Sequence, residues 1–206
     1  MMEISNIKNI IFDVGNVFVR WSPVEIVRLT FGDNVTPEPL AQHLFGTKTW
    51  MDLNRGLLTE QETKLQYQEL HGLSELETDR LFYYIKQSQI LLFDSVNLLK
   101  RAKMAGYKVY ALTDNVNEIV THLQLTYDFW QHFDGEIVSA KVGLLKPEPE
   151  IYHALLSKYD LNAAESVFID DMIHNVRGAK LVGLSAIQFK DVLQCESALT
   201  SLGVAL

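Results

Sequence analysis

Hydrophobic residues gather in five short runs along the chain, and each run predicts a β-strand. The runs are rich in β-branched and aromatic residues and lie at residues 7–12, 108–112, 135–139, 166–169 and 185–189. Two segments between them, residues 94–105 and 149–159, space their apolar residues as one face of a helix. Because strands and helices alternate, the pattern predicts an α/β fold with a doubly wound, Rossmann-like parallel sheet as its core.

Residues 18–92 interrupt this alternation, because no convincing strand pattern occurs there. Two capping boxes, which are typical of helix starts, lie in this stretch: Thr59 with Glu62, and Ser74 with Glu77. We therefore expect a small helical cap domain at residues 18–92, inserted into a catalytic core of residues 1–17 and 93–206. An insertion that directly follows the first strand can close over a site at the end of that strand, as a lid does.

Polar side chains follow three of the predicted strands at their carboxyl ends. Asp13 follows the first strand, residues 113–115 (Thr-Asp-Asn) follow the second, and residues 170–171 (Asp-Asp) follow the strand at 166–169. In open α/β sheets, ligands bind outside the carboxyl ends of the strands. These side chains therefore predict a functional site at that edge of the sheet.

Composition and charge narrow the classes of partner. The chain has 206 residues, 48% of them apolar, and a formal net charge of -8, so we expect no nucleic acid partner and no anionic membrane surface. It has neither an apolar run of roughly 18 residues nor a basic, cleavable start. Its single cysteine, Cys195, cannot form an internal disulfide, and a reducing cytoplasm is the simplest expected location. The oligomeric state is left open.

Four short segments, taken in order, resemble the four motifs of the haloacid dehalogenase superfamily. They are residues 12–17 (Phe-Asp-Val-Gly-Asn-Val), 112–115 (Leu-Thr-Asp-Asn), 146–149 (Lys-Pro-Glu-Pro) and 168–171 (Phe-Ile-Asp-Asp), with Asn175 four residues further on. The resemblance covers nearly the whole chain, including an insertion where that superfamily carries its helical cap. Within the superfamily, the first segment and the Trp-Ser-Pro that follows at residues 21–23 are most similar to the bacterial α-D-glucose-1-phosphate phosphatase group.

The resemblance implies a Mg2+-dependent hydrolase of a small phosphomonoester, with a sugar phosphate as the candidate substrate, and the chemistry of the residues agrees. Asp13 can attack phosphorus and form an aspartyl-phosphate. Mg2+ prefers carboxylates and carbonyls, which Asp13, Asp171 and the backbone carbonyl of Gly15 would supply. Asp170 is expected to support the metal without binding it directly. The partner is then a small phosphorylated metabolite.

Other motif residues are expected to hold the phosphate. Thr113 can donate its hydroxyl to a phosphate oxygen, and Lys146 can stabilise the transferring group and pair with the nucleophile. The backbone amide of Asp114 and the residue Asn115 complete the expected phosphate site. Asn175 is a weaker candidate, which would bind a water of the metal or anchor the loop.

Two positions depart from the family pattern. Most phosphatases of the superfamily carry a second Asp, the general acid and base, two residues after the nucleophile, and this chain has Gly15 there. General acid–base catalysis contributes about 10²- to 10⁴-fold, so its loss favours a good leaving group such as the anomeric oxygen of a sugar. At Asp114, many relatives have Asn, and a carboxylate facing the phosphate would repel it; we expect the side chain to point away.

Three alternatives remain beside this interpretation. A dehalogenase of the same fold forms its Asp ester at carbon and needs no metal, which the paired acids at 170–171 disfavour. A phosphomutase would need the acid–base group that Gly15 lacks. A catalytically silent phosphate-binding protein would keep the pocket but has no need of a nucleophile. In the cap, Arg20, Lys48 and Arg55 are weak candidates for contacting the substrate, and we expect the tryptophans to pack in the core or the cap.

Overall fold

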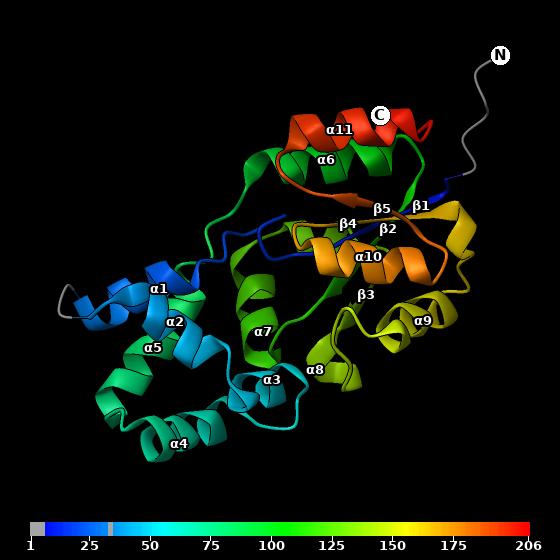
Figure 1. Cartoon of the computed structure of the whole chain (residues 1–206). Coiled ribbons are helices and arrows are strands. Elements are labelled where there is room, and N and C mark those ends of the chain that lie inside the picture. The colour runs from blue at the N-terminus through cyan, green and yellow to red at the C-terminus, as the bar shows by residue number, and fades with distance from the viewer. Residues whose placement is uncertain (1–6, 33–34) are drawn as a thin grey trace.

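A computed structural model describes residues 7–32 and 35–206. Residues 1–6, which we assigned to the core, and residues 33–34, inside the expected cap, lie outside the described residues. Figure 1 shows a sheet covered on both faces by helices, with a second group of helices beside it. Within the described ranges, no helix has the length and apolarity needed to cross a membrane.

The sheet has five strands in the order β3-β2-β1-β4-β5, and every neighbouring pair is parallel. The strands are β1 (Asn9–Phe12), β2 (Lys108–Thr113), β3 (Gly135–Val138), β4 (Ser166–Asp170) and β5 (Ser185–Gln188). All five strands predicted from the hydrophobic runs are confirmed, with ends that differ by one or two residues. The doubly wound α/β fold is therefore confirmed, and β1 lies at its centre.

Helices cover both faces of this sheet because successive strand residues point to opposite sides. On β1, Ile10 and Phe12 face one core cluster and Ile11 faces the other. The first face is covered by α6 (Phe93–Met104), α7 (Asn117–Thr126) and α11 (Val192–Ser201), and the second by α9 (Pro149–Lys158) and α10 (Ile173–Leu181). The short helices η2 (Phe129–His132), α8 (Ser139–Val142) and η3 (Ala163–Glu165) lie in connections. Helices thus bury both faces of the sheet, as expected from strands that are apolar on both sides.

Between β1 and α6, the described residues form five α-helices. They are α1 (Pro23–Phe31), α2 (Pro37–Phe45), α3 (Lys48–Asn54), α4 (Glu60–His71) and α5 (Glu75–Gln87). Both predicted capping boxes are present, at the starts of α4 and α5. Tyr67 of α4 and Leu81 and Ile85 of α5 are fully buried, so apolar contacts hold the group together. We call residues 21–89 the helical segment.

The chain enters and leaves the helical segment side by side. The backbone N–H of Arg20 donates to the carbonyl of Ile90 (2.9 Å), and that of Leu92 donates to the carbonyl of Phe18 (2.8 Å). Val19 and Leu91 form an antiparallel bridge between these hydrogen bonds. The two crossings are therefore one short paired ribbon.

Candidate active site

The predicted polar residues meet where the chain order of the sheet reverses. From β1 the chain moves outward through β2 and β3, and later crosses to the other side of β1 to form β4 and β5. Such a switch point leaves a crevice at the carboxyl ends of the two neighbouring strands, here β1 and β4. Asp13 follows β1, its N–H donating to the carbonyl of Ile169 in β4 (2.8 Å). The nucleophile candidate is therefore fixed by both strands.

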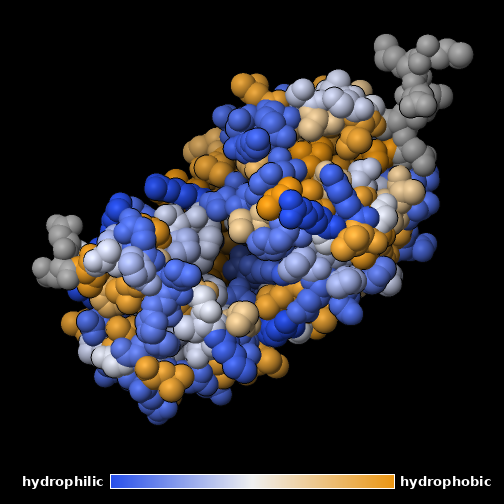
Figure 2. All heavy atoms as spheres, viewed as in Figure 1, coloured by the Kyte–Doolittle hydropathy of each residue, from blue (hydrophilic) through white to orange (hydrophobic). Residues whose placement is uncertain are grey.

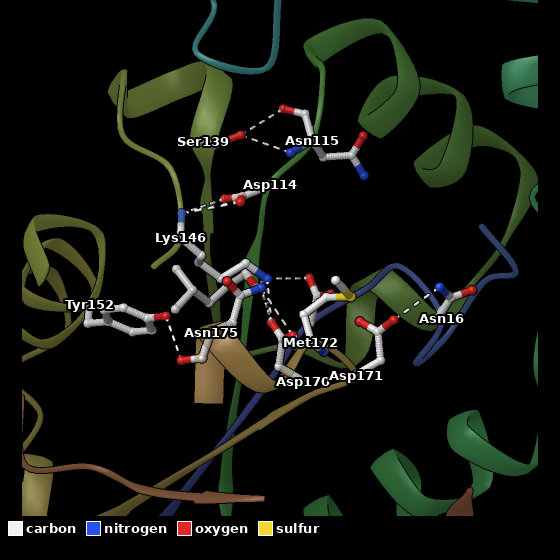
Figure 3. Close-up of polar contacts among 12 residues, drawn as sticks. Asn16, Asp114, Asn115, Ser139, Lys146, Tyr152, Asp170, Asp171, Met172 and Asn175 are labelled. Atoms are coloured by element: carbon white, nitrogen blue, oxygen red, sulfur yellow. Dashed lines mark hydrogen bonds and ion pairs between the residues drawn. The ribbon is translucent and has the colours of Figure 1, made fainter. Parts of the chain in front are cut away.

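Lys146 lies beside these strand ends, with its Nζ between two carboxylates (Figure 3). Its Nζ is 2.8 Å from Asp13 Oδ1 and 2.7 Å from Asp170 Oδ2, and it donates to the carbonyl of Leu112 (3.2 Å). The side chain is 1% exposed. Burial lowers the pKa of Lys146, but the charges of Asp13, Asp170 and Asp114 outweigh it and the net pKa lies above its ordinary value. The lysine is therefore a permanent cation with three acceptors.

Asp170 is completely buried and fully hydrogen-bonded. Besides Lys146, it accepts from the backbone N–H of Met172 (2.8 Å) and from Asn175 Nδ2 (3.1 Å to each oxygen). The carbonyl of Asn175 in turn accepts from the hydroxyl of Tyr152 (2.8 Å). Asp170 thus organises the loop between β4 and α10, and Asn175 anchors it.

Asp171 is less enclosed and has a different partner. Its Oδ2 accepts from Asn16 Nδ2 (3.1 Å), and Asn16 Oδ1 accepts from the backbone N–H of Trp21 (2.9 Å). Asn16 has φ of 53°, a left-handed conformation that Asn tolerates better than most residues. Burial raises the pKa of Asp171 and the Asn16 hydrogen bond opposes this. From the sequence, we placed Asn16 in the first motif but gave it no role. The feature that could have indicated one is its polar amide, three residues after Asp13.

The three acids suit a divalent cation. Oxygen atoms of Asp13, Asp170 and Asp171 lie within 4.8 Å of one another. Burial and the neighbouring Asp170 charge raise the pKa of Asp13 to about 7, although Lys146 lowers it. A hard cation would favour the ionised carboxylate that a nucleophile requires, and oxygen donors are the ligands Mg2+ prefers. The donor set therefore fits magnesium by chemistry.

Three residues at the carboxyl end of β2, residues 113–115, differ in their contacts. Thr113 is buried at the strand end, 1% exposed. The Asp114 carboxylate accepts from the backbone N–H of Lys146 (3.1 and 3.2 Å), so it fixes the lysine loop, and burial raises its pKa. The backbone N–H of Asn115 donates to Ser139 Oγ (2.8 Å), and its side-chain Oδ1 accepts from the backbone N–H of Val116 (2.9 Å). Asn115 is one of the residues that line the crevice.

A cavity of about 250 Å³ opens above these groups. Figure 2 shows the hollow between the helical segment and the rest of the molecule. Its lining residues come from both parts: Asp13, Gly15, Asn16, Trp21, Trp50, Asn54, Gln89, Asp114, Asn115, Ile119, Asp171 and Met172. Trp21 and Trp50 are stacked, with ring centroids 5.9 Å apart and 11° between planes. We expected tryptophans to pack in the core or cap; these two pack and also line the cavity.

The comparison with protein families decides what this arrangement belongs to. A model described as "haloacid dehalogenase-like hydrolase" matches residues 7–183. The chain is a member of this hydrolase family. The expected hydrolase of the haloacid dehalogenase type is therefore confirmed.

Relatives of this hydrolase include two phosphatases. A sesquiterpene phosphatase of Aspergillus oryzae is 29% identical over 90% of this chain and 91% of its own length. A D-ribitol-5-phosphate phosphatase of Bacteroides thetaiotaomicron is 28% identical, over 88% of this chain and 91% of its own. A haloacid dehalogenase family enzyme of the same bacterium, solved with magnesium and inorganic phosphate, shares the fold: TM-score 0.73, 21% identity, 89% of this chain and 94% of the other. The finer resemblance to glucose-1-phosphate phosphatases is not confirmed by these relatives.

The three basic residues that we considered in the expected cap, residues 18–92, do not line the cavity. Arg55 forms a two-pronged ion pair with Glu148 and also donates to the carbonyl of Gly143 (3.0 Å). Lys48 pairs with Asp52 on the surface, and Arg20 is exposed. Arg55 therefore ties the helical segment to the loop that carries Lys146.

Proposed function

We propose that this hydrolase is a Mg2+-dependent phosphatase that cleaves a small phosphomonoester through an aspartyl-phosphate intermediate. The observation that carries the proposal is the Asp13 carboxylate, held by Lys146 2.8 Å away at the end of the central strand and facing a cavity beside Asp171. The two phosphatases among its relatives support the reaction class.

In this proposal the chain itself carries out two displacements at phosphorus. A carboxylate oxygen of Asp13 attacks phosphorus, the bond to the leaving oxygen breaks, and the leaving oxygen takes a proton from water. A second water then attacks phosphorus, which releases phosphate and restores the Asp13 carboxylate. Lys146 and the Thr113 hydroxyl would stabilise the negative charge on the transferring group, together with backbone amides after β2.

Magnesium would be held by Asp13, Asp171 and the backbone carbonyl of Gly15, with Asp170 behind them. When bound, it would offset the repulsion between the Asp13 carboxylate and the phosphate dianion. Asp170 already has four hydrogen-bond or ion-pair contacts, from Lys146, Met172 and Asn175. Those contacts support a positioning role for Asp170 and leave direct binding to Asp171.

The glycine at position 15 bears on the leaving group. A Cβ atom at Gly15 would have Asp13 Oδ2 at 4.0 Å and Trp21 Cβ at 3.9 Å as its nearest neighbours, so space alone does not demand glycine. Its presence leaves the expected acid–base position without a titratable group. An anomeric sugar phosphate, whose leaving oxygen needs less protonation, is the substrate class this favours. Equal kcat/KM for glycerol 3-phosphate and glucose 1-phosphate would contradict that preference.

The helical segment would act as the cap of this active site. We propose residues 18–92 as the cap and residues 7–17 and 93–206 as the described part of the core. Trp50, Asn54 and Gln89 support this division, because the helical segment places them on the cavity wall. Substrate selection is thereby separated from the chemistry on the strand ends.

The test is phosphate release from p-nitrophenyl phosphate with and without Mg2+. The native protein should turn over only with the metal, and Asp13→Asn should lose turnover while Asp128→Asn, an exposed aspartate, should keep it. A saturating metal at about 100 times its Kd should also raise the stability of the native protein by roughly 2.7 kcal/mol, and less so in Asp171→Asn. Metal-independent chloride release from 2-chloropropionate would favour a dehalogenase instead, and binding without turnover a silent binder.

A further inference from the structure

The wall of the cavity carries no positive charge. Among the described residues that line it, the charged side chains are all aspartates: Asp13, Asp114 and Asp171. The remaining lining side chains are amides, aromatic rings or aliphatic groups. We infer that the organic part of the substrate is uncharged, so that the phosphate is its only anionic group. This inference rests on the proposed function and adds a substrate class to it.

Two cations of the neighbouring loops, Lys146 and Arg55, are already engaged. Lys146 contacts Asp13 and Asp170, and its side chain is 1% exposed. Arg55 is held by both oxygens of Glu148 and by the carbonyl of Gly143. Lys146 cannot turn to meet a second anionic group without leaving the buried Asp13 and Asp170 carboxylates without their cation, which is costly. Arg55 is not among the residues that line the cavity.

The wall instead suits a compact neutral group. The stacked Trp21 and Trp50 form its apolar side, extended by Ile119, which is 3% exposed. The carboxamide side chains of Asn54 and Gln89, 8% and 4% exposed, contribute polar atoms without charge. At about 250 Å³, the cavity lies just below the usual range of roughly 300–1,000 Å³ for ligand pockets. A polyol, a monosaccharide or a small apolar alcohol fits this chemistry.

A second anionic group would lose free energy in two ways. It would leave water for a wall with no cation, and such desolvation is expensive for an unpaired charge. It would also approach Asp114, an acidic residue of the lining whose carboxylate accepts from the backbone N–H of Lys146. Like charges repel, so the site selects against carboxylated and doubly phosphorylated esters.

Matched ester pairs test the inference: phenyl phosphate against 4-carboxyphenyl phosphate, and glycerol 3-phosphate against 3-phosphoglycerate. Binding is followed by tryptophan fluorescence in Asp13→Asn with saturating Mg2+, because Trp21 and Trp50 line the cavity and this variant cannot turn the esters over. In each pair the carboxylated ester should bind at least about tenfold more weakly. Equal affinity within both pairs overturns the inference, whether or not the native protein releases phosphate.

A gain of function completes the test. Met172 lies at the cavity mouth and is 47% exposed, so Met172→Lys can place a cation there without disturbing the core. This variant should narrow the difference within each pair about tenfold, whereas Met172→Gln, a neutral side chain of similar length, should not. If the difference in affinity within each pair is unchanged in Met172→Lys, the missing positive charge of the wall does not cause it, and the inference is wrong. Absence of turnover in the native protein would contradict the proposed phosphatase activity but not this inference, because the binding titrations in Asp13→Asn test the inference separately.

Discussion

The floor and the wall of the cavity are built on different principles. The floor is a cluster of side chains at strand ends, of which Asp13 lines the cavity, and its members bind one another: Lys146 to Asp13 and Asp170, and Asp170 to Asn175. The wall consists mainly of aromatic rings and amides of the helical segment, Trp21 among them. A few residues after β2 and β4 complete it. The hydrogen bonds of the sheet fix the backbone of the floor, whereas the wall depends on how two groups of helices pack. The proposed chemistry is therefore carried by the part that the sheet holds in place.

Lys146→Met should show the largest effect, because it removes the cation between two buried carboxylates. Breaking a buried ion pair by removing one partner typically costs about 3–5 kcal/mol, and urea denaturation of the metal-free protein should show a loss of this size. Lys180→Met, on the exposed face of α10, is the matched control and should be close to neutral. A small loss in Lys146→Met would mean that the floor is not held together by charge.

Gly56→Ala tests how closely the wall is attached to the sheet. A Cβ at Gly56 would lie 2.1 Å from the carbonyl oxygen of Ala140, and φ is +70°. Gly72 has nearly the same φ, +67°, with nothing within 4 Å, so Gly72→Ala carries the conformational cost alone. The difference in unfolding free energy between the two variants should be about 1–3 kcal/mol, as for overpacking. Equal losses would show that this contact can open freely.

Trp50→Ala separates binding from chemistry. The ring stacks on Trp21 and meets Phe45 edge to face at 4.9 Å. Aromatic pairs contribute about 0.5–1.5 kcal/mol beyond buried area, so the KM for phenyl phosphate should rise roughly two- to tenfold while kcat changes little. Trp50→Phe should recover most of the affinity. If kcat fell instead, the wall would take part in the chemistry.

The ion pair between Arg55 and Glu148 should have the smallest effect. Its side chains are 28% and 36% exposed, and water screens such pairs, so a double-mutant cycle of Arg55→Gln and Glu148→Gln should give a coupling of about 0.2–1 kcal/mol. The coupling should fall as salt is added. A coupling several times larger would mean that the pair controls the Lys146 loop.

The strands could be read from the sequence because each is one contiguous hydrophobic run, and in β1 and β4 an acid stands directly at the carboxyl end. The runs before Asp13 and Asp170 are apolar on both faces, as in a sheet covered on two sides. The helices α7, α10 and α11 were not predicted individually. Their apolar stripes are short and carry no capping box, so their helicity depends on packing against the sheet.

The floor was predictable for the same reason, and the wall was not. Carboxylates and a lysine at strand ends are recognisable candidates from residue type alone. The sheet brings Asp13, Lys146 and Asp171 together. Nothing in the sequence distinguishes Trp50 and Gln89 from the residues around them. Only the fold shows that they line the same cavity as Ile119. Asn16 needed its backbone conformation to be known before its amide could be assigned to Asp171.

The paired ribbon at residues 18–20 and 90–92 gives this architecture an evolutionary consequence. Because the hydrogen bonds between Arg20 and Ile90 and between Phe18 and Leu92 hold both crossings together, everything between them forms one contiguous cassette. Recombination at two neighbouring points can exchange that cassette for another of any length, provided its ends also meet. A different cavity wall can then arise by exchange of a single stretch of gene, while the acids and the lysine at the strand ends are inherited intact.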